Sequence, residues 1–214
     1  ALTGFVETMQ GAASNDPEAR HRFLGMMANE ADRMGRLIGD LLSLSRLQAG
    51  ERVAPTDNVN MSRLLKSVTS SLGGLAERRD ITLNLDFTDD LPMVIGDNDE
   101  LTQVFQNVVE NAIKYSAKGS EVRIFCDSNT SDSRYLCINV QDAGDGIDPT
   151  HIPRLTERFY RVDKGRSRAQ GGTGLGLAIV KHILIHHRGW LKITSELGRG
   201  STFTVNLPVA TSAS

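Results

Sequence analysis

Side chains that could hold a phosphorylated ligand recur along one face of the helix predicted over residues 97–115. At about 100° per residue, one arc of this helix is polar. It carries Gln103, Asn107, Glu110, Asn111 and Lys114. An asparagine amide oxygen can ligate Mg²⁺ without adding negative charge beside phosphates, and a lysine can meet a phosphate as a point charge. A solvated helix face is the alternative, but two asparagines one turn apart weigh against it because asparagine is a mediocre helix former.

An acidic turn directly follows a predicted strand that ends at Val140. Residues 142–147 read Asp-Ala-Gly-Asp-Gly-Ile. The Asp142 carboxylate could accept a hydrogen bond from the exocyclic amino group of adenine, and it would select against guanine, which presents a carbonyl there. Gly144 and Gly146 would let the backbone approach a flat ligand. An ordinary glycine-containing turn is the alternative.

A glycine-rich segment opens the helix predicted over residues 176–187. Residues 171–177 read Gly-Gly-Thr-Gly-Leu-Gly-Leu. Such a segment before a helix offers backbone N–H groups and a favourable dipole to phosphates. The Lys of a P-loop is absent, and the segment follows a long loop instead of the strand of a Rossmann fingerprint.

Helix and strand patterns alternate after residue 60. The expected order is a helix capped by Asn60, a strand over 81–87, the helix 97–115, strands over 121–127 and 134–141, a short helical stretch over 153–159, a helix over 176–187, and a hairpin of strands 191–195 and 202–207. Asp97 and Glu100 form the expected capping box of helix 97–115. This order predicts an α/β sandwich with a mixed, largely antiparallel sheet and helices on one face.

The first 50 residues predict a different architecture. Apolar residues in 1–11 fall on one helix face, and residues 18–49 carry a heptad-like seam that includes Met27, Met34, Ile38 and Leu41. The two helices form an antiparallel hairpin, which buries its seam as a four-helix bundle when two chains dimerise. A hairpin folded against the rest of the chain is the alternative. The expected division is α+β: a hairpin over 1–50, a linker over 51–60 and a second domain over 61–210.

Composition excludes several classes of protein. The 24 Lys and Arg residues against 26 Asp and Glu residues give a net charge of −2, which argues against nucleic-acid binding. Cys126 and Cys137 lie in apolar runs and indicate buried thiols, not a disulfide framework or a metal site.

In order along the chain, these segments resemble the sequence boxes of sensor histidine kinases. Residues 157–163 resemble that family's phenylalanine box, and residues 198–208 resemble its final glycine motif. Residues 40–46, Asp-Leu-Leu-Ser-Leu-Ser-Arg, resemble the end of its dimerisation helix. Around residues 151–156 the sequence is most similar to the phosphate-regulon sensor subgroup. The resemblance covers nearly the whole chain.

The resemblance implies a Bergerat-type sandwich that binds ATP and Mg²⁺. Asn111 would ligate the metal, Asn107 and Lys114 would contact the phosphates, Arg161 would approach the γ-phosphate, Asp142 would take the adenine amino group, and Glu110 would have a polar or basic role. The implied nucleotide-binding set is Asn107, Asn111, Lys114, Tyr115, Asp142, Gly144, Gly146, Ile147, Arg161, Gly172, Thr173, Gly174, Leu175, Gly176, Leu177 and Thr202. Residues 148–172 would form the lid over ATP.

The implied activity is transfer of the ATP γ-phosphate to a histidine and then to an aspartate of a response regulator. The implied partners are a second copy, bound through the hairpin, and a receiver domain, and the chain would be the cytoplasmic portion of an inner-membrane sensor. Two alternatives remain: another ATPase of the same fold, such as a chaperone or topoisomerase subunit, and a non-catalytic dimerisation or regulator-docking module.

We predict that this chain binds ATP without phosphorylating itself. The family phosphorylates a histidine followed by an acidic residue, and none of the five histidines here has that neighbour. We expect that the chain begins partway through the first helix, with the acceptor upstream of Ala1. Incubation with γ-labelled ATP measures this directly. Acid-labile, base-stable label on the 214-residue chain would contradict the prediction.

Overall fold

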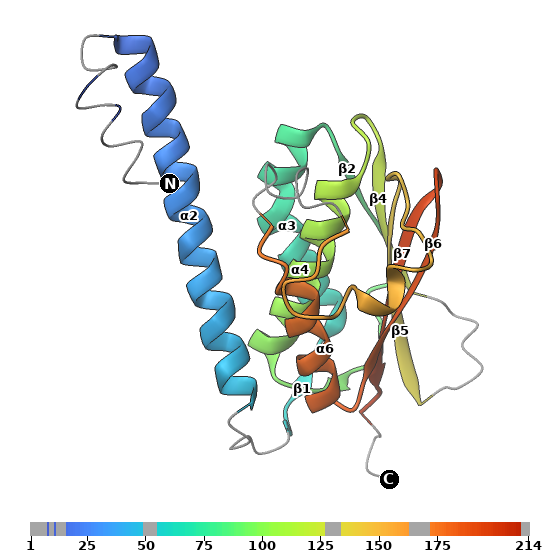
Figure 1. Cartoon of the computed structure of the whole chain (residues 1–214). Helices are drawn as coiled ribbons and strands as arrows, with labels where there is room; N and C mark the ends of the chain where they lie inside the picture. Colours follow the sequence, from blue (N-terminus) through green and yellow to red (C-terminus); the bar gives the residue numbers. More distant parts are fainter. Residues whose placement is uncertain are drawn as a thin grey trace.

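A layer of three helices covers one face of a five-stranded sheet, and a long helix stands outside that layer (Figure 1). The computed structural model describes residues 16–48, 55–126, 134–162 and 172–210, together with Thr8 and Gly11. Its elements are α2 Pro17–Gln48, β1 Asn58–Val59, α3 Met61–Arg79, β2 Thr82–Asp86, β3 Val94–Ile95, α4 Asn98–Tyr115, β4 Glu121–Cys126, β5 Tyr135–Asp142, the 3₁₀ helix η1 Ile152–Arg154, α6 Gly176–His186, β6 Trp190–Glu196 and β7 Gly200–Pro208.

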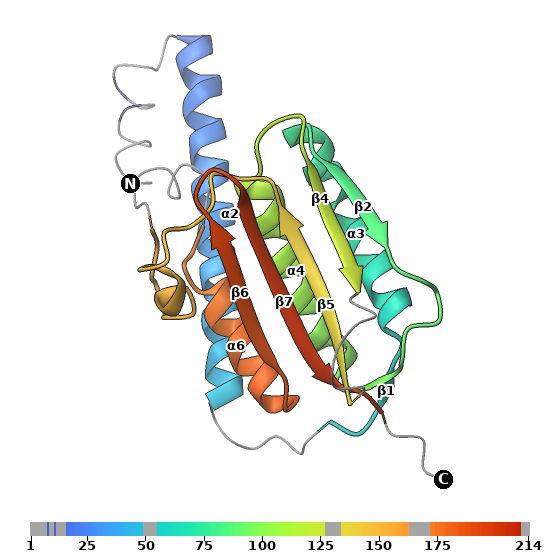
Figure 2. The ribbon, with the colours of Figure 1, turned by 90° about the vertical axis from the view of Figure 1, so that its right-hand side faces the viewer.

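The main sheet has the order β2-β4-β5-β7-β6. Strands β2 and β4 are parallel, and every other neighbouring pair is antiparallel. This confirms the mixed, largely antiparallel sheet. Figure 2 looks onto the face of the sheet opposite α3, α4 and α6. A second, two-stranded sheet joins β1 to β3, so residues 58–59 of the range expected as a linker pair with Val94–Ile95.

The core lies between the sheet and helices α3, α4 and α6, because each helix turns one apolar face toward the strands. Helix α3 begins as expected: the Asn60 side chain accepts a hydrogen bond of 2.9 Å from the Arg63 backbone N–H. The helical stretch expected over residues 153–159 is shorter, with only Ile152–Arg154 helical. Phe159 has a φ of 61°, in the left-handed region, which a continuing helix does not allow.

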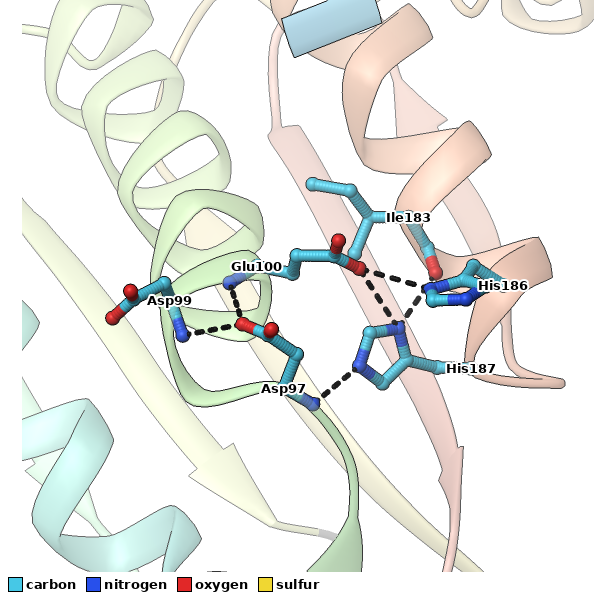
Figure 3. A network of polar contacts seen from close by, with 6 residues as sticks. All are labelled: Asp97, Asp99, Glu100, Ile183, His186 and His187. Carbon is cyan, nitrogen blue, oxygen red and sulfur yellow. Dashed lines mark hydrogen bonds and ion pairs between the residues drawn. The ribbon is translucent and has the colours of Figure 1, made fainter. Parts of the chain in front are cut away.

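The capping box expected at the start of α4 is only half correct. The Asp97 side chain accepts from the N–H groups of Asp99 and Glu100, both at 2.9 Å. The Glu100 carboxylate does not return to the Asp97 N–H. It points toward α6 and meets His186 Nδ1 at 3.1 Å, and the Asp97 N–H donates instead to His187 Nε2 at 3.0 Å (Figure 3). The start of α4 is therefore tied to the end of α6.

His187 joins the two helices in this network, and we call its two hydrogen bonds, to Asp97 and to Ile183, the His187 clamp. Its Nε2 accepts from Asp97, so the proton lies on Nδ1, which donates to the Ile183 carbonyl at 2.8 Å. Glu100, His186 and His187 are close enough together among the described residues to suggest a metal site. Since both ring nitrogens of the buried His187 are already hydrogen-bonded, the cluster serves as a polar link between two helices.

Helix α2 has one side packed against the rest of the protein and one side exposed to solvent. Leu44 is buried in the core and Leu37 packs on it, so the end of the helix docks beside α6. Most of the heptad-like seam remains exposed, including Met34, Ile38 and Leu41. The first arm of the hairpin, residues 1–11, lies outside the described residues apart from Thr8 and Gly11. Within the described part of the chain, no helix is both long and apolar enough to cross a bilayer.

Replacing His187 by Leu should destabilise the fold by about 1–3 kcal/mol, because the Asp97 N–H and the Ile183 carbonyl both lose a partner. Urea unfolding monitored by circular dichroism measures the loss. His182→Leu on the same helix is the matched control, since His182 Nδ1 bonds to the Ala178 carbonyl of its own helix. Equal stability of the two variants would show that the clamp contributes nothing.

Candidate functional site

A cavity of about 690 Å³ lies between α4, the turn after β5, η1 with the chain that follows it, and the start of α6. Its volume falls within the range of small-molecule sites. The sequence-predicted residues that line it are Asn107, Glu110, Asn111, Lys114, Tyr115, Asp142, Gly144, Gly146, Ile147, Arg161, Gly172, Thr173, Gly174, Gly176 and Leu177. Three segments that lie far apart in the sequence therefore meet around one space.

Two members of the predicted set lie outside the lining. Leu175 is fully buried in the hydrophobic core. Thr202 lies on β7 between Ser201 and Phe203, which both line the cavity. Since side chains alternate along a strand, Thr202 points to the other face of the sheet.

The polar face of α4 forms one wall. Its opposite face is fully apolar and buried, with Leu101, Phe105 and Val108 at 0% exposure. On the cavity side, Lys114 Nζ pairs with Glu110 Oε1 at 2.7 Å. This pair holds the ammonium group in the wall and leaves it with further donors for an anion.

Asn107 links this wall to α6. Its Nδ2 donates to the Gln103 carbonyl at 3.0 Å, which fixes the orientation of the amide. A Cβ at Gly176 would lie 2.8 Å from Asn107 Oδ1, so a larger residue there would displace the Asn107 amide from its present position. Amide oxygens of the kind that Asn107 and Asn111 carry are the hard, neutral ligands that suit Mg²⁺.

The buried Asp142 forms the far end of the site. Its Oδ1 accepts from the N–H groups of Gly144 at 2.9 Å and Ser201 at 3.2 Å. Burial raises the pKa of the Asp142 carboxyl, and these hydrogen bonds oppose the rise. The two N–H groups therefore fix the orientation of the carboxylate, and burial leaves its charge poorly solvated. A carboxylate placed in this way can accept a hydrogen bond from a ligand donor.

The glycines of this turn, which both line the cavity, are also needed for packing inside the protein. A Cβ at Gly144 would lie 2.3 Å from the Tyr115 carbonyl oxygen, and one at Gly146, where φ is +72°, would lie 2.1 Å from the Glu196 carbonyl oxygen. These glycines are therefore required by close contacts with α4 and the β6–β7 hairpin. Their expected approach to a ligand stays a prediction, because both glycines also line the cavity.

The start of α6 forms the opposite end. No side chain caps the helix at Leu175, and Gly176 and Leu177 of its first turn line the cavity. The Gly174 carbonyl accepts from the Phe159 N–H at 2.8 Å, which ties the chain after η1 to this turn. An uncapped helix start that faces a cavity is a favourable place for an anion.

Arg161 gives the clearest indication that the cavity suits an anion. It lines the cavity, and its Nε and Nη2 atoms are buried without a hydrogen-bond partner among the residues that the structure describes. Buried guanidinium nitrogens are costly to leave unpaired. A phosphate group would satisfy both, so the residues present fit a phosphorylated ligand.

Several lining residues were missed by the sequence analysis. Ser201 and Phe203 could have been found from the pairing of β5 with β7, in which Asp142 lies opposite Ser201. Arg36 and Asp40 come from α2, in the region assigned to the other domain, and no local pattern marks them. Asp40 Oδ2 accepts from Thr173 Oγ1 at 2.8 Å.

Two families match the chain. Residues 96–211 match the family described as histidine kinase-, DNA gyrase B- and HSP90-like ATPases. Residues 1–50 match the His Kinase A (phospho-acceptor) domain.

Curated relatives include the phosphate regulon sensor protein PhoR of Pseudomonas aeruginosa, which is 40% identical over 98% of this chain and 46% of its own length. The sensor-like histidine kinase SenX3 of Mycolicibacterium smegmatis is 40% identical over 92% of this chain and 50% of its own. The chain thus spans about half the length of the curated relatives that it matches.

Among solved structures, full-length ShkA in complex with AMPPNP superposes with a TM-score of 0.75 at 27% identity, covering 92% of this chain and 40% of that one. Histidine kinase ThkA in complex with the response regulator TrrA gives a TM-score of 0.77 at 20% identity, covering 98% and 57%. The second likeness supports the fold alone.

Asp142→Asn should raise the thermal stability of the unliganded chain at pH 7. Burial raises the pKa of this carboxyl, so the ionised form is disfavoured in the folded state, and the folded state loses stability as pH rises through the pKa. Asparagine keeps the acceptor oxygen without the charge. Calorimetric melting at neutral and acidic pH measures the difference, which should shrink below the ordinary pKa of aspartate. A variant that melts lower at pH 7 would contradict this.

Proposed function

Since the chain belongs to the histidine kinase-, DNA gyrase B- and HSP90-like ATPase family and is the ATP-binding kinase core of a sensor histidine kinase, we propose that its cavity binds ATP with Mg²⁺ for phosphoryl transfer to a histidine. One observation carries the proposal. A single cavity joins the buried Asp142 carboxylate to the unpaired guanidinium nitrogens of Arg161 and the uncapped start of α6. This arrangement suits a ligand with a donor-bearing ring at one end and phosphates at the other.

Each wall has a separate task in this proposal. Asp142 accepts from the adenine amino group, and Tyr115 borders the base. The backbone at the start of α6, together with Lys114 and Arg161, binds the phosphates. Asn111 holds Mg²⁺, with Asn107 beside it. When bound, the metal neutralises charge that develops on the phosphates.

The chain's own residues orient the γ-phosphate more than they react with it. Phosphoryl transfer depends mainly on positioning and electrostatic stabilisation. Two guanidinium nitrogens of Arg161, Nε and Nη2, are already buried in the wall, so the group needs little reorganisation to stabilise negative charge. Glu110 keeps Lys114 in place through their 2.7 Å ion pair.

The exposed side of α2 supports a second copy of the chain as a partner. Met34, Ile38 and Leu41 are each more than 40% exposed, and such a seam favours pairing with a second copy in a four-helix bundle. The phosphate would then pass to a response regulator. The division into a hairpin over 1–50, a linker over 51–60 and an ATP-binding domain over 61–210, and a place on the cytoplasmic side of an inner-membrane sensor, belong to the same proposal.

Titration calorimetry with ATP and GTP tests the nucleotide specificity. The wild-type chain should bind ATP in the presence of Mg²⁺ and bind GTP much more weakly. Asp142→Asn should weaken ATP binding by about 1–3 kcal/mol, the scale of a charge-assisted hydrogen bond. Equal affinity for the two nucleotides, or an unchanged Asp142→Asn variant, would count against the assignment.

The metal requires a separate variant. Asn111→Ala should lose most of the gain in ATP affinity that Mg²⁺ gives to the wild-type chain. Asn98→Ala, at the exposed start of the same helix, is the control and should keep that gain.

A further inference from the structure

Helix α2 reaches into the nucleotide cavity. Arg36 and Asp40 contribute to its lining, and the next turns anchor the helix: Leu44 is buried in the core, and Ser43 Oγ accepts from Gln103 Nε2 at 3.4 Å. One side of the last turns of α2 therefore faces the cavity and the core, while the apolar seam on its other side stays exposed. This end of the helix lies beside the layer of α4 and α6 (Figure 1).

Asp40 is bonded to the segment that the proposed function assigns to phosphates. Thr173 Oγ1 donates to Asp40 Oδ2 at 2.8 Å and accepts from the Leu175 N–H at 3.2 Å. One hydroxyl therefore connects the start of α6 to the carboxylate of α2. Thr173 and its neighbours Gly172 and Gly174 all line the cavity.

The charges around Asp40 are those that a phosphate would also meet. Burial raises the pKa of the Asp40 carboxyl most strongly and the Glu110 carboxylate adds to the rise, whereas the Thr173 bond and the positive charges of Arg36 and Lys114 oppose it. The cavity therefore holds a negative charge that is only partly compensated. A bound phosphate would compete with it for the same hydroxyl and cations, and two anions this close repel each other.

Resting on the proposed function of this cavity, we propose that Asp40 acts as an internal competitor of the nucleotide phosphates. The docked arrangement of α2 is then a state with low affinity for ATP. Binding of ATP breaks the Asp40–Thr173 bond and releases the end of α2 from the cavity. Nucleotide occupancy is thereby coupled to the freedom of the helix that carries the dimerisation seam.

Asp40→Asn separates the charge from the hydrogen bond, because the amide oxygen can still accept from Thr173. The full chain is titrated with ATP and Mg²⁺, with ADP and Mg²⁺, and with adenosine. We expect Asp40→Asn to bind ATP about three- to tenfold more tightly than the wild type, on the scale of a partly screened like-charge interaction. The gain should shrink with ADP and vanish with adenosine, which has no phosphate.

Asp32→Asn is the matched control. Asp32 lies on the same helix, is exposed and does not line the cavity, so its replacement changes net charge equally and should leave ATP affinity unchanged. If both variants gained the same ATP affinity, the change in net charge alone would explain the effect, and the inference would be overturned. Equal or weaker ATP binding by Asp40→Asn, with normal binding by the wild type, would overturn the inference alone and would point to a supporting role of Asp40 in binding.

A second measurement tests the release of the helix. Hydrogen exchange of the backbone amides over residues 36–45 should quicken when ATP is added to the wild type, and should already be faster in unliganded Asp40→Ala. Unchanged exchange in both cases would show that the Asp40–Thr173 bond does not hold α2, whatever the cavity binds. If neither the wild type nor Asp40→Asn binds ATP, the proposed function of the cavity fails and this inference fails with it.

Discussion

Helix α4 has to satisfy two environments on opposite sides, and the rest of the molecule is arranged around that constraint. One side is fully buried against the sheet and α6, and the other side is the polar wall of the cavity. The helix cannot rotate without moving apolar residues into the cavity or amides and charges into the core. Its start is also tied to α6 through His187, which fixes the two helices that bound the cavity (Figure 3). The positions of Asn107, Asn111 and Lys114 follow from this packing.

Much of this arrangement could be predicted because its causes are local. The polar arc of α4 is visible at helical spacing, and Asp142 is visible as an acidic residue at the end of an apolar strand. The cause of the glycines was not local: Gly144 and Gly146 are required by carbonyl groups of Tyr115 and Glu196, which are distant in sequence. Glu100 was expected to close its own helix cap, and a histidine from α6 took its place.

The contribution of α2 was the least predictable part of the site. Its heptad-like seam indicated a helix that pairs with other helices, and that side is exposed. The docked side depends on single residues, Leu44 in the core and Asp40 at Thr173, that no periodicity separates from the seam. The proposed competition between Asp40 and the nucleotide phosphates acts on the docked side alone.

The most direct test of this account is a crystal structure of the chain with a non-hydrolysable ATP analogue and Mg²⁺. The account predicts the adenine ring at Asp142, the phosphates between the start of α6 and Arg161, and Asp40 separated from Thr173. Phosphates bound elsewhere, or a nucleotide seated with the Asp40–Thr173 bond intact, would contradict it.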